Sequence, residues 1–368
     1  MKKVKIGDAC DILNGFAFKS DKYVEKGIRI IRIANVQKGF IEDNVPTFYP
    51  MDSTGLEKYM LNEDDLLMSL TGNVGRVALL QKEMLPAALN QRVACLRLKT
   101  DRITKGFLFH ILNSDFFEQQ CVLASNGVAQ KNMSTEWLKD YEIPLYSIQE
   151  QMKITDILDK TKRIIVEKNN ELSALNELIK ARFVEMFGDL RKNTKGWKVK
   201  KFEEITNLIT DGEHTTPKRV ENGIYLLSAR NILNHSIQLE DVDYINQEEY
   251  ERITKRVIPQ EGDVLISCSG TVGRCCSVPL GLKFQMVRSV ALLRFKKSIN
   301  PVFAEYMITS DYLQEQINKS KTVSSQANLF QGKIKTLNGF VPPIEFQNQF
   351  SDFVRAIDKS KVIFKFCS

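Results

Sequence analysis

Two short loops carry the residue types best suited to bind a phosphate group or the edge of a base. They run from Thr71 to Arg76 (TGNVGR) and from Ser269 to Arg274 (SGTVGR). Two glycines three residues apart permit a tight turn, and an arginine directly after the turn can reach a phosphate oxygen or a guanine. The alternative is a plain hairpin with a surface arginine, and the residue types alone do not decide between the two.

Other side chains suited to DNA lie in both halves of the chain. Arginine pairs with guanine, and asparagine or glutamine with adenine, through two hydrogen bonds each. Any one of these residues alone is more often a surface or capping residue, so only recurrence in both halves favours a binding role. With the polar residues of the two loops, which are Thr71, Asn73, Arg76, Ser269, Thr271 and Arg274, the candidates are Lys19, Arg32, Asn35, Arg92, Gln130, Lys131, His214, Thr215, Thr216, Lys218, Arg230, Asn231 and Gln326.

The two loops belong to an internal repeat. Asp65–Arg76 aligns with Asp263–Arg274 at an offset of 198 residues, with seven of the twelve positions identical. The match continues around Gln151 and Gln349, again 198 residues apart. The repeat predicts two copies of a module of roughly 150 residues, each followed by a helix.

Within each copy, the residue pattern predicts a mixed α+β fold. Short runs that are apolar, or that alternate apolar and polar residues, are typical of strands. Strands are predicted over 27–36, 65–69, 76–80, 93–98, 223–229, 263–267 and 290–295, and helices over 107–122 and 302–317. The turn residues between the strands favour mostly antiparallel sheets.

A long amphipathic helix is predicted from about residue 149 to residue 187. Apolar residues recur at every seventh position, and no proline or glycine interrupts the run before Gly188. The recurring residues are Leu158, Ile165, Leu172, Ile179 and Met186. Such an apolar stripe needs a covering surface, which for a spacer rod is a partner helix. The alternative is an ordinary long helix on a globular core.

The overall composition bounds the class of protein. A chain of 368 residues with 43% hydrophobic and 26% charged residues is expected to form two globular domains and a connector. The net charge of +7 favours a polyanionic partner, although a solvated basic surface would give the same value. No apolar run is long enough to cross a bilayer, and the N-terminus lacks a signal-peptide pattern. A cytoplasmic location is therefore expected.

Catalytic and metal sites are not indicated by the sequence. The seven cysteines form no CxxC pair and the three histidines have no ligand-like spacing. We therefore expect reduced, mostly buried thiols and no metal site. The chain also lacks a GxxxxGK[ST] phosphate loop, a GxSxG elbow and a GxGxxG fingerprint. We expect no catalytic residue and no cofactor in this chain.

The junctions between the modules and the helices resemble a known family. They are Ile143–Gln151 (IPLYSIQEQ) and Val341–Gln349 (VPPIEFQNQ). The starts of the two modules (GFAFKS from Gly15, and DGEHTTPK from Asp211) and the helix end ARFVEMFGD from Ala181 add to the likeness. Over essentially its whole length, the chain resembles the specificity (S) subunit of type I restriction–modification enzymes.

The resemblance implies a fold and a set of partners. Residues 1–148 and 191–345 would be two similar target recognition domains, each reading one half of a gapped sequence in double-stranded DNA. Residues 149–190 and 346–368 would be spacer helices that pair as an antiparallel coiled coil and dock two modification (methyltransferase) subunits. Those subunits would bring S-adenosylmethionine, and restriction (endonuclease and translocase) subunits would bring ATP and Mg²⁺. The S chain itself would catalyse nothing.

One departure from the family concerns the second helix, which is about half as long as the first. Three explanations fit this short helix: the chain is naturally short, its reading frame is shifted near the end, or it has been cut. We therefore expect the second half of the stripe on the first helix to be less covered within one chain. A neighbouring chain would be able to fill it.

Two other functions compete with DNA recognition. One is a structural coiled-coil adaptor that binds proteins without reading DNA, and the other is a stand-alone enzyme. Salt-sensitive binding to duplex DNA separates recognition from the adaptor. Methyl transfer by this chain alone would favour the enzyme.

Overall fold

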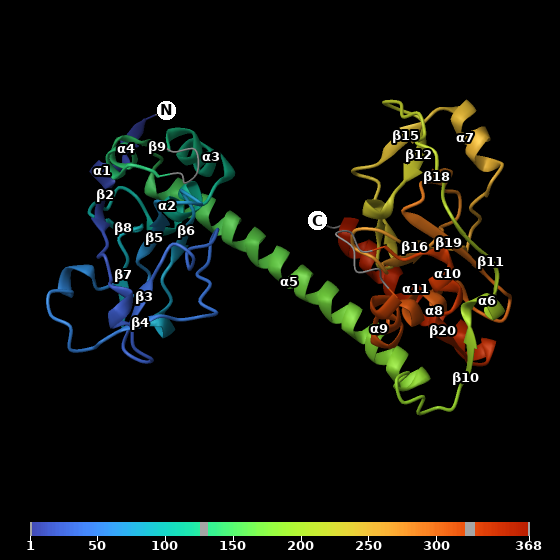
Figure 1. The fold of residues 1–368 in the computed structure, drawn as a ribbon. Coiled ribbons are helices and arrows are strands. Elements are labelled where there is room, and N and C mark those ends of the chain that lie inside the picture. The colour runs from blue at the N-terminus through green and yellow to red at the C-terminus, as the bar shows by residue number, and fades with distance from the viewer. Residues whose placement is uncertain (1, 126–131, 321–327, 367–368) are drawn as a thin grey trace. The chain divides into compact units, whose positions relative to one another are not determined.

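The computed structural model describes residues 2–125, 132–320 and 328–366, with side chains up to Lys361. It forms two compact units, Met1–Glu167 and Lys168–Ser368. The division falls inside the long helix α5 (Ile148–Phe187), which gives its first half to one unit and its second half to the other. Each unit is described by itself below (Figure 1).

Unit 1 is built on a four-stranded antiparallel sheet in the order β2-β8-β5-β6. A smaller sheet, β4-β3-β7, contains one parallel pair, β3 with β7. The elements before α5 are β1 (Lys3–Lys5), α1 (Ile6–Ala9), β2 (Cys10–Asn14), β3 (Ile28–Ile31), β4 (Phe48–Tyr49), β5 (Leu66–Ser69), β6 (Val77–Leu79), β7 (Ala87–Leu89), β8 (Val93–Leu98), α2 (Lys105–Leu112), α3 (Asp115–Ala124), α4 (Thr135–Asp140) and β9 (Glu142–Pro144).

Unit 2 repeats this topology. Its main sheet has the order β11-β19-β16-β17, and its smaller sheet, β15-β12-β18, again contains one parallel pair, β12 with β18. The elements are β10 (Lys198–Lys201), α6 (Phe202–Ile205), β11 (Thr206–Asp211), β12 (Ile224–Leu227), β13 (Ile232–Leu233), β14 (Ser236–Ile237), β15 (Asp243–Ile245), α7 (Gln247–Thr254), β16 (Val264–Ser267), β17 (Cys275–Ser277), β18 (Phe284–Met286), β19 (Val290–Phe295), α8 (Pro301–Thr309), α9 (Asp311–Ser320), α10 (Gln331–Lys335), β20 (Asn338–Val341) and α11 (Ile344–Phe366). The predicted repeat of mixed, mostly antiparallel modules is confirmed.

Each main sheet lies between two hydrophobic cores. Successive strand residues point to opposite faces, so Val264 and Ile266 join the core of the helical end, whereas Leu265 joins the core below the smaller sheet. In unit 1, Met68 and Leu67 divide in the same way. Figure 1 shows the helices α8, α9 and α11 at one end of unit 2 and the smaller sheet at the other. Burial on both faces explains why these strands are apolar throughout.

The helices predicted over 107–122 and 302–317 are each two helices in the structure. In unit 1, the chain turns at Ser114, whose side chain accepts a hydrogen bond from the backbone N–H of Phe117 (3.2 Å) and caps α3. In unit 2 the break is at Ser310, whose hydroxyl donates to the carbonyl of Met307 (2.6 Å). A serine hydroxyl replaces backbone partners at helix ends, and this competes with a continuous helix.

A buried glutamine anchors the start of each long helix. The Gln151 amide accepts from the N–H of Thr104 (2.8 Å) and donates to the carbonyl of Tyr146 (3.0 Å). Gln347 makes the matching bonds in unit 2, accepting from the N–H of Asn300 (2.9 Å) and donating to the carbonyl of Pro342 (2.7 Å). Gln151 therefore corresponds to Gln347, so the predicted match with the exposed Gln349 is wrong by two residues.

The prediction that the second half of the α5 stripe is less covered is wrong. Ile179 is buried and Met186 packs against the same core of unit 2. The exposed part is the first half, where Leu158 and Ile165 of the stripe keep 41 and 55% of their surface. Their neighbours Ile157 and Ile164 keep 62 and 55%.

The direction of the helices explains this reversal. Phe187 contacts Phe350 (ring centroids 5.6 Å apart), and Arg182 lies over the ring of Phe353 (5.7 Å). The later residue of α5, Phe187, contacts the earlier residue of α11, and the earlier residue of α5, Arg182, contacts the later one. The two helices therefore run antiparallel. The start of α11 therefore meets the end of α5, not its beginning.

The predicted buried, reduced thiols are confirmed for the residues that the structure describes, where the free cysteines are Cys10, Cys95, Cys121, Cys268, Cys275 and Cys276. Burial raises the pKa of the Cys10, Cys121 and Cys268 thiols to about 12, so almost no thiolate exists at neutral pH.

We expect a maleimide at pH 7.5 to label at most one thiol per native chain. The six described cysteines are buried, and only Cys367 lies outside the described residues. All seven cysteines should react after unfolding. Two or more labels on the native chain, counted by mass spectrometry, would contradict the packing.

Candidate nucleic-acid interface

In unit 1, three loops meet at one end of strand β5. The N–H of Leu70, directly after β5, donates to the carbonyl of Arg92 (3.0 Å), and its carbonyl accepts from the N–H of Met133 (2.9 Å). Thr71 also pairs with Asn132 in an isolated β-bridge. The candidates Thr71, Asn73, Arg76 and Arg92 are therefore brought together, as a cluster of loop residues 70–76, 90–92 and 132–133.

Unit 2 builds the same cluster. The N–H of Cys268 donates to the carbonyl of Ser289 (2.8 Å), the N–H of Leu329 donates to the carbonyl of Cys268 (2.9 Å), and Ser269 pairs with Asn328. A fourth segment joins here, because the N–H of Arg288 donates to the carbonyl of Glu213 (2.9 Å). The segment around Glu213 thus joins the loop cluster of unit 2 through Arg288.

The conformation of the paired loops is set by a serine at the end of the strand. The Ser267 hydroxyl donates to the carbonyl of Thr271 (2.6 Å) and accepts from the N–H of Arg274 (3.0 Å). Ser69 makes the corresponding bonds to Asn73 and Arg76 in unit 1. The serine holds the turn closed, so the arginine leaves the turn in the same backbone setting in both units.

The backbone conformation and close packing both require glycine at the second glycine position of each loop. Gly75 and Gly273 have φ angles of 81° and 94°, a region that favours glycine. A Cβ atom on Gly75 would lie 2.7 Å from the sulfur of Cys121 in α3, and one on Gly273 would lie 2.9 Å from the side chain of Gln314 in α9. The glycines thus let the loop pack on a helix of its own unit.

The two loop arginines differ in their partners. The guanidinium of Arg76 donates to Gln37 (2.6 Å) and lies 3.6 Å from a carboxylate oxygen of Glu118. Among the described residues, no hydrogen bond or ion pair engages the guanidinium of Arg274, which is half-buried. Arg274 is therefore the loop cation most available to a phosphate or a base.

Asn35 and Asn231 have structural roles that replace the predicted DNA contact. They keep only 4% and 1% of their surface. Asn35 uses both amide protons on the carbonyl of Glu42 and the carboxylate of Asp43, 2.9 Å from each, and Asn231 likewise uses its amide protons on two carbonyls. Because a buried amide of this kind fixes a turn, neither side chain is free to read a base.

Arg32 and Arg230, which neighbour these asparagines, also face their own unit. Arg32 is half-buried, and one guanidinium nitrogen donates to the carbonyl of Val45 (3.4 Å). Arg230 pairs with Asp243 (3.0 Å) and Asp241 (3.5 Å). The two carboxylates largely neutralise the charge of Arg230, which weakens the case for a DNA contact there. Arg32 has no carboxylate partner among the described residues, so its charge stays available.

The loop from Asp211 to Lys218 is polar, but most of its polar groups form hydrogen bonds within unit 2. His214 lies 2.9 Å from Asp211, and the Thr215 hydroxyl donates to Glu213, which lowers the pKa of that carboxyl group. The backbone N–H of Lys218 donates to Glu249 (3.2 Å). The side chain of Thr216 is exposed.

Several exposed candidates remain. Lys19 and Arg92 are exposed, and no described residue bonds to their charged groups. Arg288, which precedes the strand in unit 2 that matches the one after Arg92, is exposed too and lies 196 residues after Arg92. The candidates Gln130, Lys131 and Gln326 lie outside the described residues.

No group of three or more metal-ligating side chains lies within the described parts of the chain. None of the helices in those parts is both long enough and apolar enough to span a membrane.

The fold and these loops define a class of protein. Each of two repeated α+β modules presents a polar, arginine-bearing loop cluster at one end of a strand of its main sheet, and a long amphipathic helix joins the modules in sequence.

The chain belongs to the family of the type I restriction modification DNA specificity domain, which matches residues 1–176 and 194–365. Over 97% of its length, it is 25% identical to the type I restriction enzyme EcoBI specificity subunit of Escherichia coli, of which the match covers 78%. It is 30% identical to the MjaVIII specificity subunit of Methanocaldococcus jannaschii over 46% of this chain and 41% of that protein.

A solved structure shares the fold. The S subunit of a type I restriction–modification system from M. genitalium superposes with a TM-score of 0.62 at 14% identity, over 99% of this chain and 91% of that one.

Proposed function

We propose that this chain is the non-catalytic DNA-recognition subunit of a type I restriction–modification complex. The observation that carries the proposal is the loop cluster that recurs in both units with the same serine-closed turn. Phosphate contacts from arginine and lysine supply affinity, and base edges supply specificity. One cluster in each unit suits a target with two halves.

The two clusters differ enough to read different sequences. Asn73 in unit 1 corresponds to Thr271 in unit 2. Arg76 is held by Gln37 and Glu118, whereas Arg274 is not held in this way. Two unlike readers in one chain would recognise an asymmetric target, with a gap between its half-sites.

Partner subunits would supply the chemistry. The first half of α5 exposes Ile157, Ile164 and Ile165, and a row of exposed apolar residues on a helix is typical of a protein-binding surface. Two modification subunits would dock on the helices with their S-adenosylmethionine. Restriction subunits would then add ATP and Mg²⁺, and this chain would hold no cofactor of its own.

Salt dependence of duplex binding tests the recognition role. Release of counterions makes the affinity for DNA fall steeply with salt, so the logarithm of the binding constant should fall linearly with the logarithm of salt concentration. Fluorescence anisotropy with a labelled duplex library measures this slope. An adaptor without DNA readout would show no salt-dependent duplex binding.

Exchange of one module tests the division of labour. We expect replacement of residues 191–345 by the corresponding module of another family member to change one half-site and leave the other half-site and the gap unchanged. Sequencing of modified DNA from cells that express the hybrid with its partner subunits measures both halves. A change in both half-sites would contradict independent reading.

A further inference from the structure

Phe330 lies at the edge of the loop cluster of unit 2. It directly follows Leu329, whose backbone N–H donates to the carbonyl of Cys268 (2.9 Å), next to the loop of Ser269–Arg274. Phe330 keeps 58% of its surface. Within the described residues, it joins none of the hydrophobic cores of unit 2. A large aromatic side chain is therefore exposed beside the candidate DNA-binding loop.

The internal repeat identifies Ser134 of unit 1 as the counterpart of Phe330, 196 residues earlier. Met133, just before Ser134, donates its backbone N–H to the carbonyl of Leu70 (2.9 Å), which matches the bond of Leu329 in unit 2. The two residues thus hold the same place, each directly before a short helix, α4 in unit 1 and α10 in unit 2.

The two residues differ in what they do for the helix that follows. The Ser134 hydroxyl accepts from the backbone N–H groups of Glu136 (3.1 Å) and Trp137 (3.5 Å) and so caps α4. Phe330 has no group that could accept such a bond, and α10 begins without a side-chain cap. Because a capping serine stabilises a helix, unit 2 lacks a stabilising contact that unit 1 has, and it exposes an aromatic ring in the same place.

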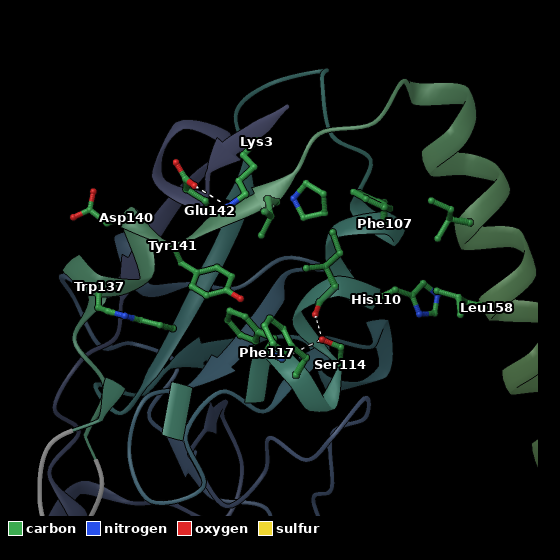
Figure 2. A pocket seen from close by; sticks show the side chains of 15 residues that line it. Lys3, Phe107, His110, Ser114, Phe117, Trp137, Asp140, Tyr141, Glu142 and Leu158 are labelled. Atoms are coloured by element: carbon green, nitrogen blue, oxygen red, sulfur yellow. Dashed lines mark hydrogen bonds and ion pairs between the residues drawn. The ribbon is translucent and has the colours of Figure 1, made fainter. Parts of the chain in front are cut away.

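The aromatic side chain of this short helix also changes place between the units. In unit 1, Trp137 packs beside Tyr141 and Phe117, with ring centroids 5.1 and 6.5 Å away (Figure 2). Its counterpart in unit 2 is Lys333, which is exposed. Among the described residues, no hydrogen bond or ion pair engages the ammonium group of Lys333. Unit 2 therefore presents an exposed ring at Phe330 and, three residues later, an unpaired cation.

These features together fit a contact with DNA. A single exposed phenylalanine is common on protein surfaces, but here it coincides with a lost cap at the edge of a loop cluster. Residues that break local rules in this way are expected where function requires them. Gln331 fixes the start of α10, because its side-chain amide donates to the carbonyl of Ile209 in β11. The ring is thus carried on an anchored element.

We propose that Phe330 is a DNA-contact residue of unit 2, whose ring packs on the apolar surface of a base in the half-site that this unit reads, with Lys333 on a neighbouring phosphate. Aromatic rings bind bases in this way, and lysine binds phosphate oxygens. The inference rests on the proposed DNA recognition and adds an apolar contact that the polar loops do not supply. Unit 1 has Ser134 and Trp137 at these places, so the contact belongs to one half-site only.

Phe330→Ser tests this contact, because it restores the residue that unit 1 has. The backbone at this position already has the extended angles of a capping residue (φ −82°, ψ 151°). We expect the affinity of the full chain for its target duplex to fall about tenfold or more. The melting temperature of unit 2 should rise by about 2 °C as α10 gains a cap. A residue with only a structural role would lower the melting temperature instead.

Fluorescence anisotropy with a labelled duplex that carries the motif mapped in cells measures the affinity. An apolar contact releases no counterions, so Phe330→Ser should leave the salt slope unchanged, whereas Lys333→Ala should reduce it by about one. Phe330→Trp should keep the Kd within about threefold. The matched control is Phe116→Ser, which removes a phenylalanine of α3 that keeps 65% of its surface and lies outside both loop clusters. It should also change the Kd less than about threefold.

A duplex with uracil in place of thymine identifies the apolar surface of the base. If wild type binds this duplex less tightly and Phe330→Ser does not, the ring packs on a thymine methyl group in the major groove. If wild type binds both duplexes equally and still exceeds Phe330→Ser about tenfold, the ring packs on a base face at an opened step.

Two results would overturn this inference and leave the proposed function intact. One is an unchanged affinity of Phe330→Ser, which would assign the exposed ring to a protein contact. The other is a weaker affinity together with a lower melting temperature, which would show that Phe330 supports the fold. Absence of salt-dependent duplex binding by the wild-type chain would instead overturn the proposed function, and this inference with it.

Discussion

Arg274→Ala should weaken binding of the chain to its target duplex by about tenfold or more, because the loop then loses its most available cation. A contact of this kind contributes about 1–3 kcal/mol, whether to a phosphate or as two hydrogen bonds to guanine. The Ser267 hydroxyl bonds to the backbone of the loop and not to the guanidinium, so the turn should persist in the variant. Anisotropy at several salt concentrations measures the loss and the change in slope.

Two further variants make this result specific. Arg76→Ala should have a smaller effect on DNA affinity, because its guanidinium is already bonded to Gln37. Arg274→Lys should restore binding if the contact is to a phosphate, but not if it is bidentate to guanine. If Arg274→Ala leaves both the affinity and the salt slope unchanged, the loop cluster of unit 2 is not at the DNA interface.

Asp263→Ala should lower the free energy of unfolding by about 3 kcal/mol. The carboxylate of Asp263 is 2% exposed and accepts two hydrogen bonds from Arg294, at 2.8 and 2.7 Å. It also accepts from the N–H of Gln260 (2.8 Å). Removing it leaves a partly buried guanidinium without its counter-charge, although Arg294 keeps 28% of its surface, which limits the cost. A thermal scan should show a fall in melting temperature of roughly 8 °C.

Asp65→Ala is the matched variant in unit 1, where Arg97 forms the same pair. We expect a loss of similar size in a separate unfolding transition of that unit. The hydrogen bonds to Asp263 raise the pKa of Arg294 above its usual value. Stability from a raised pKa is lost only as pH rises through that value, so the difference from wild type should stay constant between pH 6 and 9. A loss below about 1 kcal/mol would show that the pair is not structurally important.

Much of the fold could be predicted because the module occurs twice in the sequence, as an internal repeat. Apolar runs before Gly72 and Gly270 indicated the central strands, and the absence of proline or glycine indicated α5. What was missed depends on local capping or on contacts distant in sequence. Ser114 and Ser310 each end one helix where the apolar pattern predicts a single continuous helix. The antiparallel packing of α11 on α5 depends on contacts between the two helices and cannot be predicted from the sequence of either one.

The candidate site was predictable only in part. Residue type suggested Asn35 and Asn231 as readers, but an asparagine is equally suited to closing a turn, and burial decides which role it takes. Type also could not distinguish Arg76 from Arg274, because the difference lies in Gln37 and Glu118, which come from elsewhere in the chain.

Base-resolution mapping of methylated adenines, in DNA from cells that carry this gene with its partner subunits, tests the central claim most directly. Two unlike readers in one chain predict a single modified motif with two short specified parts, separated by a gap of unspecified bases with a fixed length. One uninterrupted word, a palindrome with identical halves, or DNA without any new modified motif would contradict that account.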